Sequence, residues 1–222
     1  MTGIAATAPN PDRAALIRVG NTVRARLAAD PAVQKVPVEQ VELYALSDFI
    51  TPAECAQLIE MIDRVAQPSR TFDQGYGRTS YSGDVERSAP FVRMIERRID
   101  DLLGIPHLFG ETIQGQRYLP GQEFQAHHDW FHTKAAYWKD EKRRGGQRSW
   151  TAMAYLGEVE EGGTTDFPSI GVSIPPQPGA LIVWNNARAD GSLNDDTLHA
   201  GTPVVRGAKY VITKWYRTRN WG

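Results

Sequence analysis

The sequence predicts a mainly β protein, a sandwich or barrel such as a jelly roll, with helices packed outside it. Two observations carry this prediction. The first hundred residues place apolar side chains at helical spacing, whereas from Glu111 onward eight or nine short apolar runs follow one another. Glycine and proline pairs such as Pro120-Gly121 and Gly162-Gly163 separate these runs, as turns separate the strands of an all-β fold.

Composition excludes several classes of protein. The chain has 222 residues, of which 41% are hydrophobic, and its formal net charge is −1. The apolar content rules out a disordered chain, and the near-zero charge argues against a dedicated DNA-binding module, which needs a basic surplus. The single cysteine, Cys55, cannot form an internal disulfide, and no apolar run approaches the roughly eighteen residues of a membrane helix. We therefore expect a cytoplasmic protein that binds neither nucleic acid nor membrane.

The first helix is expected over residues 10–29. It begins at Asn10-Pro11, which resembles an N-cap residue followed by proline at the first helical position. Its apolar residues recur at helical spacing and are Leu16, Val19, Val23 and Leu27. A connector over residues 35–40 and a short strand over residues 41–46 should follow.

Two further helices precede the strand-rich half. Thr51 and Glu54 form a capping box, and Pro52 between them occupies the first helical position. The apolar face of this helix includes Cys55, which we interpret as a small buried residue rather than a nucleophile. A third helix is expected over residues 86–103, with Gly104 as its stop.

The remaining runs predict the strands of the β domain. They cover residues 112–119, 123–129, 149–157, 164–167, 171–174, 180–185, 197–200, 203–206 and 208–217. No internal repeat or low-complexity segment interrupts them. The helices are therefore expected to pack against the β domain rather than to form a second one.

The histidines include a pair with metal-ligand spacing. His127 and Asp129 lie two residues apart in the run over 123–129, and side chains alternate along a strand, so both would share one face. His199, on a distant run, is the candidate for a third ligand. Two imidazoles and one carboxylate leave three positions of an octahedron open, which is the arrangement of non-haem Fe(II) oxygenases.

Lys209 follows His199 by ten residues and lies on the last apolar run. Its neighbours include Tyr210, Val211 and Trp215, which indicate a largely buried strand. A buried ammonium group without a partner is costly, so a bound carboxylate would explain it. A solvated lysine on an edge strand is the alternative.

Several stretches together resemble the 2-oxoglutarate- and Fe(II)-dependent dioxygenases of the prolyl 4-hydroxylase type. They are GQRYLPGQEFQAHHDWF, GGQRSWTAMAYLGEVEEGGTTDFP, PGALIVWN and LHAGTPVVRGAKYVITKW, with LSDFITPAECAQLI and GRTSYSGD nearer the N-terminus. The resemblance covers residues 41–217. It implies a double-stranded β-helix (jelly roll) over 111–217 within a domain over 41–222, preceded by a helical extension over 1–40.

The resemblance also implies the cofactors and the reaction. The cofactors are Fe(II), 2-oxoglutarate as co-substrate and O2, and the reaction hydroxylates a side chain of a protein, peptide or amino acid, with proline among the candidates. Succinate and CO2 are released. By position, the implied residues are His127, Asp129 and His199 for the metal; Lys209, Tyr118 and Thr165 for 2-oxoglutarate; and Arg148, Trp215 and Phe124 for the substrate. Because related halogenases lack the carboxylate ligand, Asp129 favours hydroxylation.

The sequence departs from the family at three positions around the site. Phe124 stands where peptidyl-prolyl enzymes commonly have tyrosine, Ala126 where a proline is frequent, and His128 where an aromatic residue is common. None of these residues is an implied ligand of the metal or the co-substrate. They bear on the choice of substrate, which the sequence leaves open.

Two other functions use the same residues. A zinc hydrolase would activate water on the three ligands, but it gives Lys209 and Thr165 no task. A non-catalytic jelly-roll module would keep the metal for structure alone. The polar stretch over 132–148 is either a substrate-closing lid or a surface insertion, and the oligomeric state and the role of residues 1–40 stay open.

Overall fold

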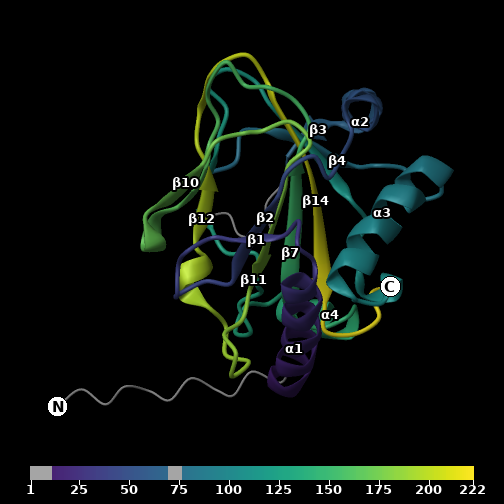
Figure 1. Ribbon diagram of the computed structural model, residues 1–222, viewed down its shortest axis with the longest axis vertical. Helices are drawn as coiled ribbons and strands as arrows, with labels where there is room; N and C mark the ends of the chain where they lie inside the picture. Colours follow the sequence, from purple (N-terminus) through teal and green to yellow (C-terminus); the bar gives the residue numbers. More distant parts are fainter. Residues whose placement is uncertain (1–11, 70–76) are drawn as a thin grey trace.

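The computed structural model describes residues 12–69 and 77–222. These residues form a large antiparallel sheet, with a smaller sheet facing it on one side and helices covering it on the other (Figure 1). The predicted class, mainly β with helices packed outside, is confirmed.

The large sheet has eight strands and the small sheet four. Across the large sheet the order is β1 (Gln34–Lys35), β2 (Leu43–Leu46), β11 (Leu181–Asn185), β7 (Arg148–Tyr155), β14 (Lys209–Arg217), β5 (Gln114–Tyr118), β4 (Tyr81–Asp84) and β3 (Gln67–Pro68). Across the small sheet it is β10 (Val172–Ile174), β9 (Thr165–Phe167), β12 (His199–Gly201) and β6 (Phe124–His127). A separate ribbon pairs β13 (Val204–Arg206) with β8 (Glu161–Gly162).

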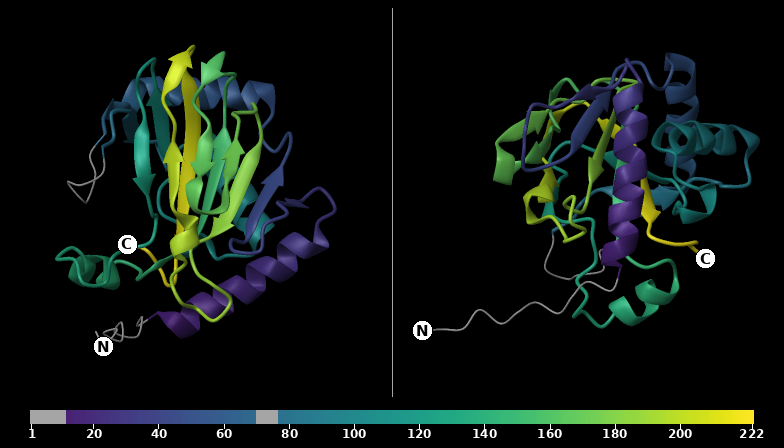
Figure 2. Two further views of the ribbon diagram at one scale, coloured as in Figure 1. Left: turned by 90° about the vertical axis from the view of Figure 1, so that its left-hand side faces the viewer. Right: turned by 60° about the horizontal axis from the view of Figure 1, so that its bottom comes forward.

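The helices in the described residues are four α-helices and three short 3₁₀ turns. The α-helices are α1 (Arg13–Ala29), α2 (Pro52–Val65), α3 (Pro90–Leu103) and α4 (Trp138–Arg143), and the 3₁₀ turns are η1 (His107–Phe109), η2 (Pro168–Ile170) and η3 (Asp195–Thr197). Figure 2 shows α4 apart from the other helices, near the C-terminus of the chain. Among the described helices, none has the length and hydropathy needed to cross a bilayer.

The second helix follows its predicted capping chemistry. The hydroxyl of Thr51 accepts from the amide of Glu54 at 3.3 Å, and the carboxylate of Glu54 accepts from the amide of Thr51 at 2.9 Å. Cys55 is buried on the inner face of α2, as expected. These reciprocal bonds satisfy the first amides of the helix and fix where it begins.

The third helix begins later than predicted. It starts at Pro90 rather than at residue 86, because a proline forces the preceding residue out of the helical region, and Ala89 is extended with φ −62° and ψ 127°. It ends as predicted at Gly104, whose φ of +66° is the left-handed conformation of a helix C-cap.

Helix α1 packs against α3 and β7 through an apolar face. Leu16, Val23 and Leu27 are buried there. The expected start at Asn10-Pro11 lies outside the described residues. The division of the chain into an extension over 1–40 and a domain over 41–222 stays a prediction.

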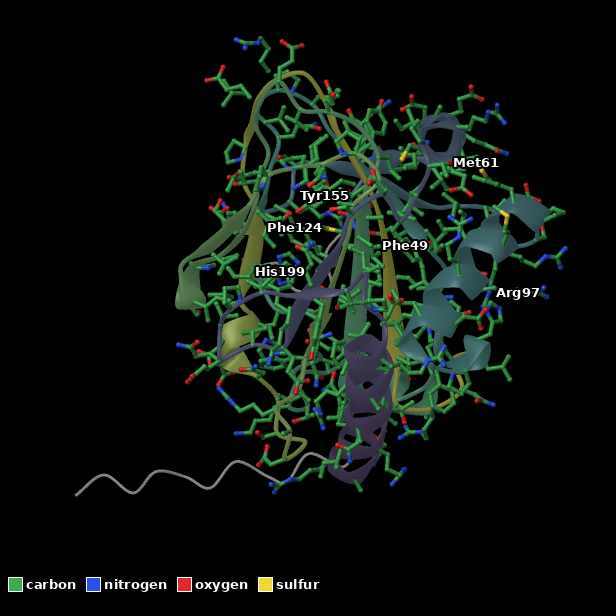
Figure 3. All side chains as sticks on the ribbon, in the orientation of Figure 1. Phe49, Met61, Arg97, Phe124, Tyr155 and His199 are labelled. Atoms are coloured by element: carbon green, nitrogen blue, oxygen red, sulfur yellow. The ribbon has the colours of Figure 1, made fainter. Side chains whose placement is uncertain are left out.

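Alternation along the central strands creates two cores. On β7, Trp150, Ala152 and Ala154 face the helices, whereas Met153 and Tyr155 face the small sheet. The core between the sheets surrounds the candidate site. Figure 3 shows Phe124, Tyr155 and His199 on that side of the large sheet, away from Met61 and Arg97 on the helices.

Every strand predicted after residue 111 has an observed counterpart, but the ends differ. The predicted strand over 123–129 ends at His127, and the chain then bends through Asp129. Residue 197, predicted to begin a strand, instead closes η3. The polar strand β4 and the helix α4 were not predicted.

Candidate active site

Three predicted metal ligands come together where β6 and β12 pair. His127 and His199 are direct cross-strand partners, and Asp129 follows in the bend after β6. One ligand atom from each lies within 4.8 Å of the other two, and all three side chains are buried. The two histidines are 72 positions apart in the chain, and the pairing of β6 with β12 places them side by side.

Backbone carbonyls set the orientation of both imidazoles. The Nδ1–H of His127 donates to the carbonyl of Gln125 at 2.9 Å, and the Nδ1–H of His199 donates to the carbonyl of Thr197 at 3.0 Å. A carbonyl can only accept, so the proton sits on Nδ1 and the lone pair on Nε2. Each Nε2 lies 3.8 Å from a carboxylate oxygen of Asp129. Both rings therefore present their free nitrogen to the same point.

The charge states suit a divalent cation. Burial, together with neighbouring His199, lowers the pKa of His127 to about 3, so this imidazole is neutral at physiological pH. Burial alone would raise the pKa of Asp129, but the histidines, Arg148 and the hydrogen bond from Thr151 together outweigh it, so the net direction is down. Two imidazole nitrogens and one carboxylate oxygen, with no thiolate, fit Fe(II) in a facial set of three. This donor set therefore fits the metal that the sequence predicted.

Aromatic rings hold the ligands from both sides. The ring of Phe124 stacks on His127 with 3.6 Å between centroids, and Trp184 packs edge-on against His199 at 4.9 Å. Phe167 lies 5.5 Å from His199. These contacts restrict ring rotation and exclude water from the buried side of the site.

Lys209 lines a narrow inner cavity together with the three residues of the triad. Its Nζ donates to Thr165 Oγ1 at 3.2 Å and to the carbonyl of Thr164 at 3.4 Å, and no described carboxylate lies within ion-pair distance. Only 2% of the residue is exposed, and this burial lowers the pKa of Lys209 to about 7. A carboxylate placed here would restore the charged form of the amine.

Thr165 is prepared to donate to the same ligand. Its Oγ1 accepts from the Tyr155 hydroxyl at 2.8 Å as well as from Lys209. With both acceptor positions of the oxygen in use, the hydroxyl proton of Thr165 is left to donate into the cavity. Ammonium and hydroxyl together fit one carboxylate, as expected for the far end of 2-oxoglutarate.

Tyr118 lines the inner cavity but its hydroxyl is engaged. It donates to Gln116 Oε1 at 2.7 Å, and the amide of Gln116 donates in turn to Thr213 at 3.0 Å. The ring of Tyr118 also faces the ammonium of Lys209 at 5.5 Å. Its predicted role in holding the co-substrate stays a prediction.

The three predicted substrate residues line an open outer cleft of about 240 Å³. The guanidinium of Arg148 is already paired within the protein. Its Nε and Nη2 donate to the carboxylate of Glu111 at 2.7 and 2.8 Å, and it lies 4.1 Å from the ring centroid of Trp215. Phe124 and Trp215 line both the cleft and the inner cavity. The cleft therefore reaches the triad through apolar rings.

The remaining histidines lie outside the triad. His128 follows the end of β6, so the strand alternation predicted for it does not apply, and its Nε2 lies 2.9 Å from the carbonyl of Asp195. Together with Trp130 and His132 it forms a stack along the cleft wall, with centroid separations of 4.6 and 4.7 Å. His107 pairs with Asp100 at 2.8 Å, away from the site.

Comparison with known proteins identifies the family. The family model of the 2OG-Fe(II) oxygenase superfamily matches residues 113–217. Prolyl 4-hydroxylase 1 of Arabidopsis thaliana is 31% identical over 233 residues, which cover 95% of this chain and 77% of that protein. The chain belongs to the 2OG-Fe(II) oxygenase superfamily. Prolyl 4-hydroxylase 5 of the same plant is 33% identical, with 76% of this chain and 66% of that protein covered.

Solved structures agree with this assignment. A viral collagen prolyl hydroxylase from Paramecium bursaria Chlorella virus-1, solved as a 2OG complex, is 27% identical with a TM-score of 0.63, covering 78% of this chain and 94% of that one. A prolyl-4-hydroxylase from Pseudomonas putida, 18% identical with a TM-score of 0.55 and 90% and 98% coverage, shares the fold. This oxygenase is a 2-oxoglutarate-dependent dioxygenase that uses Fe(II) and O2, and neither the zinc hydrolase nor the non-catalytic module is favoured.

Several polar residues of the site were not predicted. Thr151 donates to Asp129, and Asn186 donates to Thr151. Tyr155 donates to Thr165, and Arg78 lies over Phe124 with its guanidinium 4.6 Å from the ring centroid. Arg78 falls in the GRTSYSGD stretch, so its motif could have drawn attention to it. Nothing in the local sequence marks Thr151 or Asn186, because their roles depend on the pairing of distant strands.

Proposed function

We propose that this oxygenase hydroxylates a prolyl residue of a protein or peptide. The observation that carries the proposal is the pair of cavities that meet at the triad. His127, Asp129, Phe124 and Trp215 line both of them. The inner one is narrow and contains the buried cation of Lys209, which suits a small dicarboxylate. The outer one is open and lined by aromatic rings, which suits a larger and less charged substrate.

The ligands and the inner cavity set up the reaction. His127, Asp129 and His199 would hold Fe(II), which together with 2-oxoglutarate supplies the O2 chemistry that places a hydroxyl group on a carbon atom. Lys209 and Thr165 bind the far carboxylate and so orient the other end of the co-substrate toward the triad. The surrounding aromatic rings keep water out.

The outer cleft positions the substrate. Trp215 and Phe124 line the cleft together with His127 and Asp129, so a substrate group that reaches these ligands lies beside the two aromatic rings. A prolyl ring is apolar enough to pack there, and the named relatives are prolyl 4-hydroxylases. The faces of the Phe124 ring are covered by His127 and Arg78, so Phe124 contributes an apolar ring edge to the cleft rather than a hydroxyl.

The first experiment tests whether the protein binds Fe(II) and 2-oxoglutarate at one site. Under anaerobic conditions, addition of Fe(II) followed by 2-oxoglutarate should produce the weak visible charge-transfer band of a chelated 2-oxo acid. His199→Ala should abolish the band, and Lys209→Ala should require far more 2-oxoglutarate. Absence of the band in the wild type, with tight zinc binding instead, would contradict the chemistry.

The substrate is tested with matched peptides. Proline-containing peptides, the same peptides with alanine at that position, and free proline would be incubated with the complete system and examined by mass spectrometry. Addition of one oxygen atom to the proline peptides alone supports the proposal. Hydroxylation of free proline alone would make the protein an amino-acid hydroxylase.

A further inference from the structure

We infer that Thr151 and Asn186 are positioning residues for the metal site, because they decide which oxygen of Asp129 is offered to the cation. The inference rests on the metal-binding role of the triad. Thr151 lies on β7 and Asn186 directly after β11, and neither residue is exposed at all. Neither side chain makes a described hydrogen bond to the predicted co-substrate residues, and the Thr151 hydroxyl bonds the metal ligand Asp129 directly.

A directed pair of hydrogen bonds connects them to the carboxylate. The side-chain amide of Asn186 donates to Thr151 Oγ1 at 2.9 Å, and the Thr151 hydroxyl donates to Asp129 Oδ2 at 2.7 Å. A hydroxyl has one proton, and an amide NH2 can only donate. Because the amide of Asn186 cannot accept the Thr151 proton, the Thr151 hydroxyl donates that proton to Asp129.

This bond makes the two oxygens of Asp129 unequal. Each oxygen lies 3.8 Å from a histidine Nε2, Oδ1 from His127 and Oδ2 from His199. Only Oδ2 accepts a hydrogen bond, from Thr151, and no donor among the described residues reaches Oδ1. A carboxylate with one oxygen held by a donor offers the other oxygen to a metal. A single oxygen from Asp129 keeps coordination positions available for a 2-oxo acid and O2, which a facial set of three requires.

The same loop also holds a second ligand. Asn186 is fixed by its backbone, whose amide donates to Ser149 at 2.8 Å and whose carbonyl accepts from Asn194 at 3.0 Å. The carbonyl of Asn194 accepts from the Thr197 hydroxyl at 2.6 Å, and Thr197 in turn accepts from His199 Nδ1. Residues 186–197 thus position Asp129 through Thr151 and His199 through Thr197.

The test measures metal binding rather than turnover. Mn(II), which is stable in air, would be titrated into the apoprotein by calorimetry for the wild type, Thr151→Val and Thr151→Ser. Valine keeps the shape and removes the donor, whereas serine keeps the donor. We expect Thr151→Val to bind Mn(II) about 10- to 100-fold more weakly and Thr151→Ser to bind within about threefold of the wild type.

A second variant tests the direction of the bonds. Asn186→Asp replaces the donor by a carboxylate that accepts the Thr151 proton, so the hydroxyl should leave Asp129 and Mn(II) affinity should fall as in Thr151→Val. Thermal unfolding checks that each variant is folded, and Thr151→Ala repeats the test if the valine variant is not.

The outcomes separate the inference from the proposed function. Wild-type Mn(II) affinity in folded Thr151→Val would overturn the positioning role while leaving the oxygenase intact. Equal losses in Thr151→Val and Thr151→Ser would also overturn it, because they would indicate packing rather than the hydrogen bond. A wild-type protein that binds no divalent metal would instead overturn the proposed function.

Discussion

The inner cavity and the outer cleft differ in what builds them. The inner cavity takes its polar groups from paired strands: Lys209 opens β14 directly opposite Tyr118 on β5, and Thr165 begins β9. The outer cleft takes much of its lining from the bend after β6 and from the end of the chain, including Trp130 and Trp221. Strand pairing fixes side chains more tightly than connecting segments do, so the chemistry is held on strands and the substrate is met largely by loops.

The two sides also differ in charge. The ammonium of Lys209 has no carboxylate partner in the described part of the chain, whereas the guanidinium of Arg148 is held by Glu111. The amine of Lys209 is therefore available to pair with an anionic ligand, whereas the guanidinium of Arg148 is already neutralised by Glu111. This contrast predicts that the two sides respond differently to substitution.

The largest effect is expected from removing the inner cation. Lys209→Met should weaken 2-oxoglutarate binding by about 100-fold or more, because losing one partner of a buried charge pair costs roughly 2–5 kcal/mol. Calorimetry of the Mn(II)-loaded protein with 2-oxoglutarate measures this loss. Peptide affinity should change little, and unchanged 2-oxoglutarate binding would show that the anion sits elsewhere.

The outer charge should matter for stability instead. Glu111 pairs with both Arg148 and Arg217 in a buried network, and these arginines lower its pKa although burial opposes them. Glu111→Gln should lower the free energy of unfolding by about 3 kcal/mol, because it leaves the buried guanidinium of Arg148 without its carboxylate partner. Denaturant unfolding measures the change.

A surface pair provides the matched control for this variant. Arg206 and Glu160 form an exposed ion pair at 2.7 Å, so Arg206→Ala should cost less than about 1 kcal/mol. Glu111→Gln should leave 2-oxoglutarate affinity unchanged in the folded protein. A loss of co-substrate binding equal to that of Lys209→Met would erase the distinction between the two sides.

The sequence predicts the strand-borne part of the molecule well. Period-two apolar runs separated by glycine and proline locate the strands from residue 112 onward, and the capping box locates α2. Strand β4 was not predicted because its residues, Tyr81-Ser82-Gly83-Asp84, show no apolar alternation. Helix α4 escaped because it is short, and a buried pair between Glu141 and Arg217, 76 positions apart, holds it.

The site shows the same limit. His127 and Asp129 were predicted to share a face of one strand, yet the strand ends at His127 and a bend brings Asp129 round to the histidines. The spacing gave the right grouping because a tight bend and a strand both bring residues two apart within reach of one ion. The hydrogen bonds of Thr151 and Asn186 could not be predicted, because sheet pairing decides them.

Proton uptake should mark the inner site alone. With its pKa lowered to about 7, Lys209 is largely neutral above that pH in the free protein, and a bound carboxylate raises this pKa again. Binding then requires a proton, so 2-oxoglutarate affinity should fall by up to about tenfold per pH unit between pH 7.5 and 9. Calorimetry at several pH values measures this slope.

An arginine variant is the matched control for the slope. Arginine stays protonated over this whole range, so Lys209→Arg should bind 2-oxoglutarate with an affinity that varies little with pH. The slope should also be absent for peptide binding. An equal slope in Lys209→Arg would assign the proton to another group.

The smallest effect is expected where the two cavities meet, at Phe124. Its ring stacks on His127 and lies under Arg78, and tyrosine is common at this position in peptidyl-prolyl enzymes. Phe124→Tyr adds one hydroxyl, and a hydrogen bond to a substrate would be worth about 1 kcal/mol. The value of kcat/KM for a proline peptide should therefore rise about fivefold, with 2-oxoglutarate affinity unchanged. If Phe124→Tyr changed only the affinity for 2-oxoglutarate, the added hydroxyl would lie in the inner cavity. Phe124 would then belong to the co-substrate site rather than to the substrate cleft.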